Sequence, residues 1–318
     1  MADGRTPGGL PSVAQARMAE IRRSGTWGSS LSTSEFAAIR STGFEPVGQV
    51  LGAAVYNVGY TGGYYCPGSW TGYGGFLSPV RAPTEVSSRG GWSSFAPLVQ
   101  TMYRARRTAI ERMIRECAEL GGHGVVGVRL QIGAFPAGGL EFRAIGTAVR
   151  ASGPVTGPQP ATPFSSLLSG QDFAKLIATG WVPAGLVLGI SIGARHDDWL
   201  TVGQTRWGSG NQEVAGYTEL VNAARHDARS QLESDVRRHG ADAVVVSDME
   251  MHVSERDCPS QEGRRDHIVE VTITGTAIAR FDRTSRTAPA PSLAVLSLDP
   301  QRRQASRVRL GRTAPGRV

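Results

Sequence analysis

The pattern of apolar and polar positions repeats along the chain, and each repeat predicts the same elements. Residues 31–52 and 168–189 align without a gap at an offset of 137, and 11 of the 22 positions are identical. Residues 105–128 align with 224–247 at an offset of 119, so the first copy carries 18 additional residues between its two conserved parts. We therefore interpret the chain as two divergent copies of one module.

Each copy begins with the same two elements. Ser32 and Ser169 are followed three residues later by an acidic residue, the capping-box spacing that predicts a short helix. Strands are predicted next, over residues 44–56 and 181–192, where shared glycines favour bends or a close backbone approach.

A long helix and two strands complete each copy. The first long helix has one apolar stripe, and Cys117 lies on it, which predicts a core position and not a nucleophile. Charged residues four apart, such as Arg112 and Glu116, predict a solvated face. Alternating apolar residues over 125–132 predict a strand that returns over 142–149, and the second copy has counterparts over 243–253 and 267–281. The predicted fold class is α+β: two tandem β-α-β-β modules, each with a helix packed on a small, mostly antiparallel sheet.

Composition divides the chain into five parts. They are a disordered leader (1–24), a first module (25–150), a Pro/Gly-rich linker (151–163), a second module (164–281) and a disordered Arg-rich tail (282–318). The tail region from residue 281 onward carries eight Arg and two Asp, which leaves the other 280 residues nearly neutral. Such a tail can attract an acidic partner, although its default interpretation is a solvated end.

The chain has no apolar run long enough for a membrane span and no signal-peptide pattern at its start. Its three cysteines are odd in number and widely spaced, which favours a reducing compartment over a disulfide framework. We therefore expect a cytoplasmic protein.

Three segments of the first copy carry a family resemblance: Gly48–Gly52, Leu120–Val128 and Gly146–Val149. Their order resembles the YbjQ-like family, which is labelled heavy-metal binding, and the second copy matches more weakly through Gly240–Val245 and Gly275–Ala277. The resemblance implies a dodecin-like module that joins edge strands into a ring, and hence a homo-oligomer. Small sheets with open edges favour the same outcome on physical grounds.

Soft metal ligands are concentrated in the second copy. His252 and His267 flank the predicted hairpin loop that contains Cys258, so they could approach across its base and bind a divalent metal of the zinc or copper type. The alternative is a charged surface loop with incidental histidines, since no CxxC or HxxxH spacing is present.

The insertion of the first copy is rich in aromatic residues and glycine. Such a loop can form a subunit interface or stack on a small planar ligand. The residues concerned are Tyr56, Tyr60, Tyr64, Tyr65, Trp70 and Tyr73.

Catalytic signatures such as GxxxxGK[ST], GxSxG and HExxH are absent from the sequence. The preferred hypothesis is a non-catalytic, oligomerising protein with an assembly, scaffold or binding role. The alternative is a metal- or small-ligand-binding protein that uses the second-copy hairpin or the Tyr-rich loop.

Overall fold

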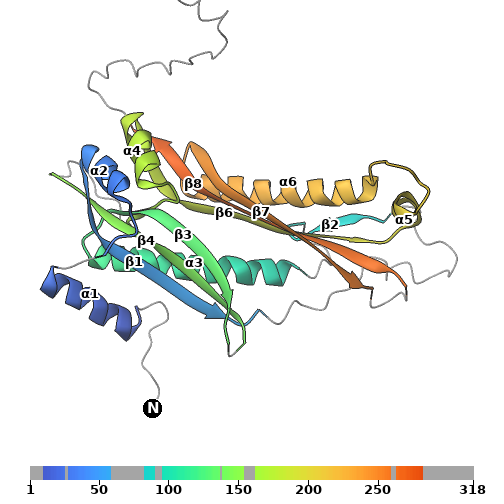
Figure 1. The fold of residues 1–318 in the computed structure, drawn as a ribbon, viewed down its shortest axis with the longest axis horizontal. Helices are drawn as coiled ribbons and strands as arrows, with labels where there is room; N and C mark the ends of the chain where they lie inside the picture. Colours follow the sequence, from blue (N-terminus) through green and yellow to red (C-terminus); the bar gives the residue numbers. More distant parts are fainter. Residues whose placement is uncertain are drawn as a thin grey trace, which may run out of the picture. The chain divides into compact units, whose positions relative to one another are not determined.

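The computed structural model describes residues 10–25, 28–58, 82–89, 95–136, 138–153, 162–258 and 263–281. Residues up to Phe281 form one compact unit, which holds two four-stranded sheets and the helices packed on them (Figure 1). The helices are α1 (Ser12–Ser24), α2 (Thr33–Ser41), α3 (Ala96–Glu119), α4 (Gly170–Ala178), α5 (Trp199–Thr205) and α6 (Ala215–Arg238). The strands are β1 (Phe44–Tyr56), β2 (Thr84–Val86), β3 (Gly124–Ala134), β4 (Leu140–Ala151), β5 (Phe164–Ser165), β6 (Trp181–His196), β7 (Ala243–Asp257) and β8 (Arg265–Arg280).

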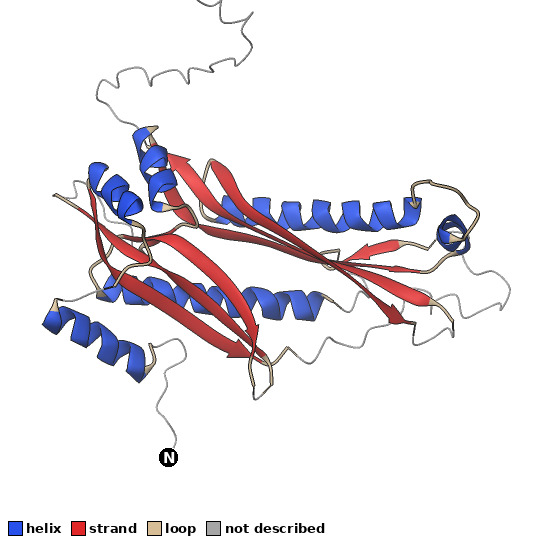
Figure 2. Cartoon of the chain, viewed as in Figure 1, coloured by secondary structure: helices blue, strands red, loops and turns tan. Residues whose placement is uncertain are grey.

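Each copy forms its own three-stranded antiparallel sheet. In the first copy β4 lies between β1 and β3, and in the second β8 lies between β6 and β7 (Figure 2). Both sheets have register shifts at equivalent places, for example between Pro46 and Gly48 and between Pro183 and Gly185. The predicted α+β fold class is confirmed.

The fourth strand of each sheet comes from the other copy. β5 precedes the second module but pairs in parallel with β3 of the first, and β2 belongs to the first module but pairs with β6 of the second. The two predicted modules are therefore joined through their sheets and not only by the linker between them.

Helix α3 packs on both sheets. Its Met113 and Ala109 lie in a core that also contains Leu186 and Leu188 of β6, while Phe95 and Val99 pack on Ile190 and its neighbours. Helix α6 covers the opposite face of the second sheet. The order of layers is thus first sheet, α3, second sheet, α6.

Glycine permits the close approach of each long helix to its sheet. A Cβ at Gly52 would lie 1.8 Å from the Ala109 carbonyl oxygen, and one at Gly189 would lie 2.1 Å from that of Ala228. These positions are equivalent in the two copies, which explains why the shared glycines occur within strands.

Two sequence expectations need correction. The leader over 1–24 was expected to be disordered, whereas residues 12–24 form α1, which buries Met18 and bonds to α3 through Arg22 and Glu119. Glu116 was expected on a solvated face, whereas its side chain is buried against β1. By contrast, Cys117 is a core residue as predicted, and burial raises the pKa of its thiol to about 12.

Candidate functional site

Each long helix places one buried carboxylate against the first long strand of its own module. The Leu51 N–H of β1 donates to Glu116 (2.8 Å), and the Leu188 N–H of β6 donates to Asp235 (3.0 Å). Burial raises the pKa of Glu116, while the Leu51 N–H and the Arg17 guanidinium act in the opposite direction. The same device therefore covers an otherwise unpaired strand edge in both copies.

The arginine that reaches this carboxylate differs between the copies. Arg17 of α1 contacts Glu116, whereas Asp235 contacts Arg107 of α3 at 3.4 Å and Arg238 of its own helix at 2.8 Å. Residues of α1 also line a cavity together with Leu51 and the next two residues of β1. Arginines of α1 and of α3 thus reach equivalent carboxylates in the two modules.

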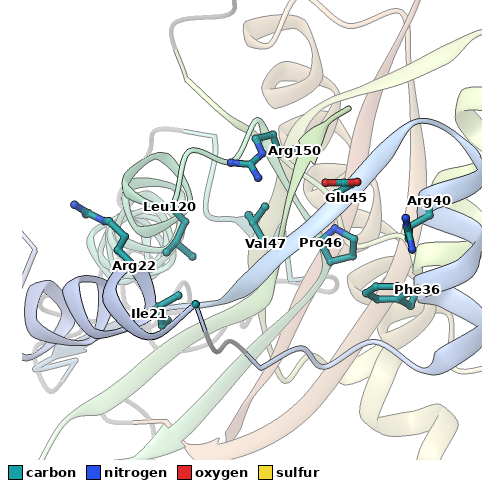
Figure 3. A pocket seen from close by; sticks show the side chains of 10 residues that line it. Ile21, Arg22, Phe36, Arg40, Glu45, Pro46, Val47, Leu120 and Arg150 are labelled. Carbon is teal, nitrogen blue, oxygen red and sulfur yellow. The ribbon is translucent and has the colours of Figure 1, made fainter. Parts of the chain in front are cut away.

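Around α1 the packing leaves open space. A hollow of about 450 Å³ lies between α1, α2 and β1, with Ile21 and Leu120 on one side and Phe36 and Pro46 on the other (Figure 3). Only Met18 of α1 is fully buried. The contact of α1 with the first module is thus limited.

The outer edges of β3 and β7 are equivalent in the repeat but differ in what covers them. The segment after the linker follows β3: the Ser166 N–H donates to Val125 (2.8 Å), the Val128 N–H to Ser166 and the Gly127 N–H to Leu168 (both 2.9 Å). β7 is the last strand of its sheet, and among the described residues no further strand pairs with it.

β7 also exposes a row of apolar side chains. These residues are between 44% and 53% exposed: Val246, Met249, Met251 and Val253. A strand of 15 residues with an open edge and exposed apolar side chains is a ready-made pairing surface.

Strands of the second sheet extend further than their counterparts in the first. β6 has 16 residues where β1 has 13, and β8 begins four residues before the position equivalent to the start of β4. This extension holds a buried cluster of His196, Cys258 and Asp266. The His196 Nδ1 and the Asp266 Oδ1 are 2.8 Å apart, and one donor atom from each of the three residues lies within 4.8 Å of the others.

A second polar network lies next to this cluster. Arg195 is buried and pairs with Asp198 (2.8 Å), which caps α5 by accepting from the Thr201 N–H (2.7 Å) and also accepts from the Ala82 N–H (2.9 Å). Burial raises the pKa of Asp198, but these three donors together hold it below its usual value. Hydrogen bonds and charge pairing therefore help to fix the extension, beside the apolar packing of Ala194 and Ile268.

Of the predicted metal ligands, the structure places only Cys258 in the cluster. His252 is exposed on β7, while His267 contacts Asp197 (2.8 Å) and Tyr217 (2.9 Å). His252 lies opposite Glu270 in the strand register and not opposite His267, so the two histidines do not converge. His196 and Asp266 complete the cluster because β6 and β8 are antiparallel neighbours that pair these two residues.

Only Tyr56 of the predicted aromatic set is described. Its hydroxyl lies 3.0 Å from the Thr108 Oγ1, and its ring packs edge-on against Phe142. Tyr56 therefore packs within its own module. The remaining members and the Arg-rich tail lie outside the described residues: Tyr60, Tyr64, Tyr65, Trp70 and Tyr73.

Among the described helices, none combines the length and the apolar character that crossing a membrane requires. No solved structure matches the chain. Comparison with known proteins therefore rests on sequence.

A family model described as "Putative heavy-metal-binding" matches residues 90–152 and 200–280, one region in each copy. The chain is 32% identical over 280 residues to the Encapsulin nanocompartment protein Rv1762c of Mycobacterium tuberculosis, covering 85% of this chain and 92% of the relative. It is also 35% identical over 78 residues to the UPF0145 protein BTH_I2656 of Burkholderia thailandensis, covering 21% of this chain and 70% of that relative. The chain therefore belongs to the YbjQ-like family, and it carries the family's module twice.

Proposed function

We propose that this protein is a non-catalytic scaffold that assembles head to tail into a closed homo-oligomer. The observation that carries this proposal is the contact between its own two modules, which joins two different surfaces. Such a heterologous contact leaves one copy of each surface unused, so it can be repeated between chains until the ring closes.

The first surface is the outer edge of the third strand. In the first module this is the edge of β3, which receives residues 164–168 from the second module. Its counterpart in the second module is the open edge of β7, where Val246, the repeat counterpart of Gly127, is 52% exposed. Covering Val246 by another module would remove apolar surface from water at about 25 cal/mol per Å².

The second surface is the segment that precedes the short helix of each module, α4 in the second module and α2 in the first. In the second module Ser166 of this segment contacts both the β3 edge and Thr276 (3.4 Å). The repeat offset equates this segment with residues 28–31, where Ser29 makes the same contact with Thr147 (3.2 Å). Residues 28–31 of one chain therefore match the β7 edge of the next chain.

Helix α1 competes with this assembly in our proposal. In the internal contact Arg107 of α3 reaches Asp235, so the repeated contact would bring α6 of a neighbouring chain towards Glu116, which Arg17 of α1 contacts. The limited burial of α1 supports its displacement by a helix of a second chain.

The printed name of the Mycobacterium tuberculosis relative links that protein to an encapsulin nanocompartment. Its 32% identity over most of both chains supports a role in assembly for this chain as well. The cytoplasm stays the expected location.

A disulfide trap tests the proposed contact. Val125 pairs with Ser165 in the internal contact, and the repeat equates these residues with Val244 and Gly28. A double variant, Gly28→Cys with Val244→Cys, should form a ladder of covalent multimers on oxidation. Reduction should convert these multimers back to single chains. A Cβ at Gly28 meets no atom within 4 Å, so this substitution should be tolerated.

The two variants that carry only one of the added cysteines, Gly28→Cys alone and Val244→Cys alone, are the matched controls and should give no ladder. Native mass spectrometry of the unmodified chain should show a closed multiple of the 33.7 kDa subunit. A protein that stays monomeric with and without α1, and that gives no ladder, would overturn the proposal.

A further inference from the structure

We propose that His196, Cys258 and Asp266 bind one divalent metal ion of the zinc type. This site differs from the one that hairpin spacing suggests, and it does not depend on assembly of the chain. Three kinds of metal-ligating side chain meet there, and each residue is at most 7% exposed.

Three strand ends position the ligands. His196 is the last residue of β6, Asp266 is the second residue of β8, and Cys258 directly follows β7. The register pairs His196 with Asp266, and the Cys258 N–H donates to the Arg264 carbonyl (2.9 Å). Backbone hydrogen bonds therefore fix the positions from which all three side chains project.

The donor set fits zinc. An imidazole nitrogen, a thiolate sulfur and a carboxylate oxygen are all ligands of this ion, at about 2.0–2.3 Å. In a tetrahedral site such bonds place the donor atoms about 3–4 Å apart, and the donors already lie within 4.8 Å of one another. Small side-chain rotations would therefore bring the three donor atoms to the distances that a tetrahedral zinc site requires.

Charge also favours a metal at this place. Two anionic ligands would neutralise the double charge of the ion, so the ion and its three ligands together would carry no net charge. Three protein ligands leave one tetrahedral position for water or another donor.

Arg256 offers an alternative explanation that a test must separate. Its Nε lies 3.8 Å from the Asp266 Oδ2, so a guanidinium already offsets part of the carboxylate charge. Without a metal, the cluster would be a hydrogen-bonded structural network. The two explanations differ in whether the protein takes up metal stoichiometrically.

Only one such site is expected in each chain. Among the described residues this is the one cluster of three ligating side chains, and the strands of the first module end before the equivalent of the extension. A family-wide property of the module would instead give two sites.

The test is titration of the chelator-treated, full-length chain with Co²⁺ as a spectroscopic substitute and with Zn²⁺. One equivalent of Co²⁺ should produce a thiolate-to-metal charge-transfer band, and Zn²⁺ should abolish it. Cys258→Ser should remove the band, while Asp266→Asn and His196→Gln should weaken binding by about 100-fold or more, since even residues outside the ligand set contribute about 10–100-fold.

His252→Ala is the matched control, because His252 is an exposed histidine of the same hairpin, and it should leave binding unchanged. Zn²⁺ should also raise the melting temperature of the unmodified chain, which distinguishes lost binding from misfolding of a variant. Absence of both the cobalt band and the zinc-induced stabilisation in the unmodified chain would overturn the proposal.

Discussion

The two modules share one fold but end differently, and the difference concentrates chemistry in one of them. In the first module β1 ends at Tyr56, and a short turn joins β3 to β4. In the second module the equivalent strands continue and enclose His196, Arg195, Asp198 and Asp266. A few additional residue pairs of sheet thus hold a buried polar region in the second module.

The modules also differ in what lies on their equivalent surfaces. The β3 edge is covered from within the chain, while the β7 edge is open. Arg107 of α3 reaches Asp235, while Arg17 of α1 reaches Glu116. The two modules therefore contact each other through one copy of each surface, and our proposal assigns the other copy to contact with a second chain.

The largest effect is expected at the open edge. In the proposed contact, Val246→Lys places a charge in the part of the β7 edge that residues 28–31 of a second chain would cover, so it should convert the oligomer to monomer in native mass spectrometry. Met251→Lys is the matched control, because its repeat counterpart Ile132 stays 45% exposed in the internal contact. If Val246→Lys leaves the oligomer intact, the β7 edge is not the surface that joins the chains.

The extension of the second module should respond strongly to loss of its buried ion pair. Asp198→Asn leaves Arg195 buried without its closest counter-ion and should lower the free energy of unfolding by about 3 kcal/mol at pH 7. Chemical denaturation measures this effect. Glu219→Gln removes the exposed partner of the same arginine and should cost less than about 1 kcal/mol.

The effect of Asp198→Asn should depend on pH. Because the pKa of Asp198 is lowered in the folded protein, its contribution is complete above the ordinary value of 3.8 and is lost as the pH falls through the lowered value. The difference between the two proteins should therefore close below about pH 4. A difference that stays constant down to pH 2 would mean that the carboxylate charge is not the cause.

The smallest effect on stability is expected from removal of α1. Deleting residues 1–24 should change the melting temperature little, because Met18 is the one fully buried residue of α1. In the proposed assembly a helix of the neighbouring chain takes the place of α1, so the deletion should increase the assembled fraction at a given concentration, as measured by light scattering. A decrease in assembly would instead make α1 part of the interface.

The sequence by itself determined the repeat, the order of the elements that the two copies share, and the fold class. Local signals suffice for these, because the caps at Ser32 and Ser169 and the alternation in the strands depend on neighbours close in the chain. The apolar position of Cys117 was predictable for the same reason.

Only the tertiary structure decided which distant residues meet. Cys258 lies with His196, 62 positions earlier, because β6 and β7 both flank β8, and the strand register, not sequence spacing, aligns their ends. Glu116 is buried because β1 presents an unpaired N–H to it, a demand that no helical pattern reveals. The exchange of β2 and β5 likewise depends on open sheet edges, which exist only after each sheet has formed.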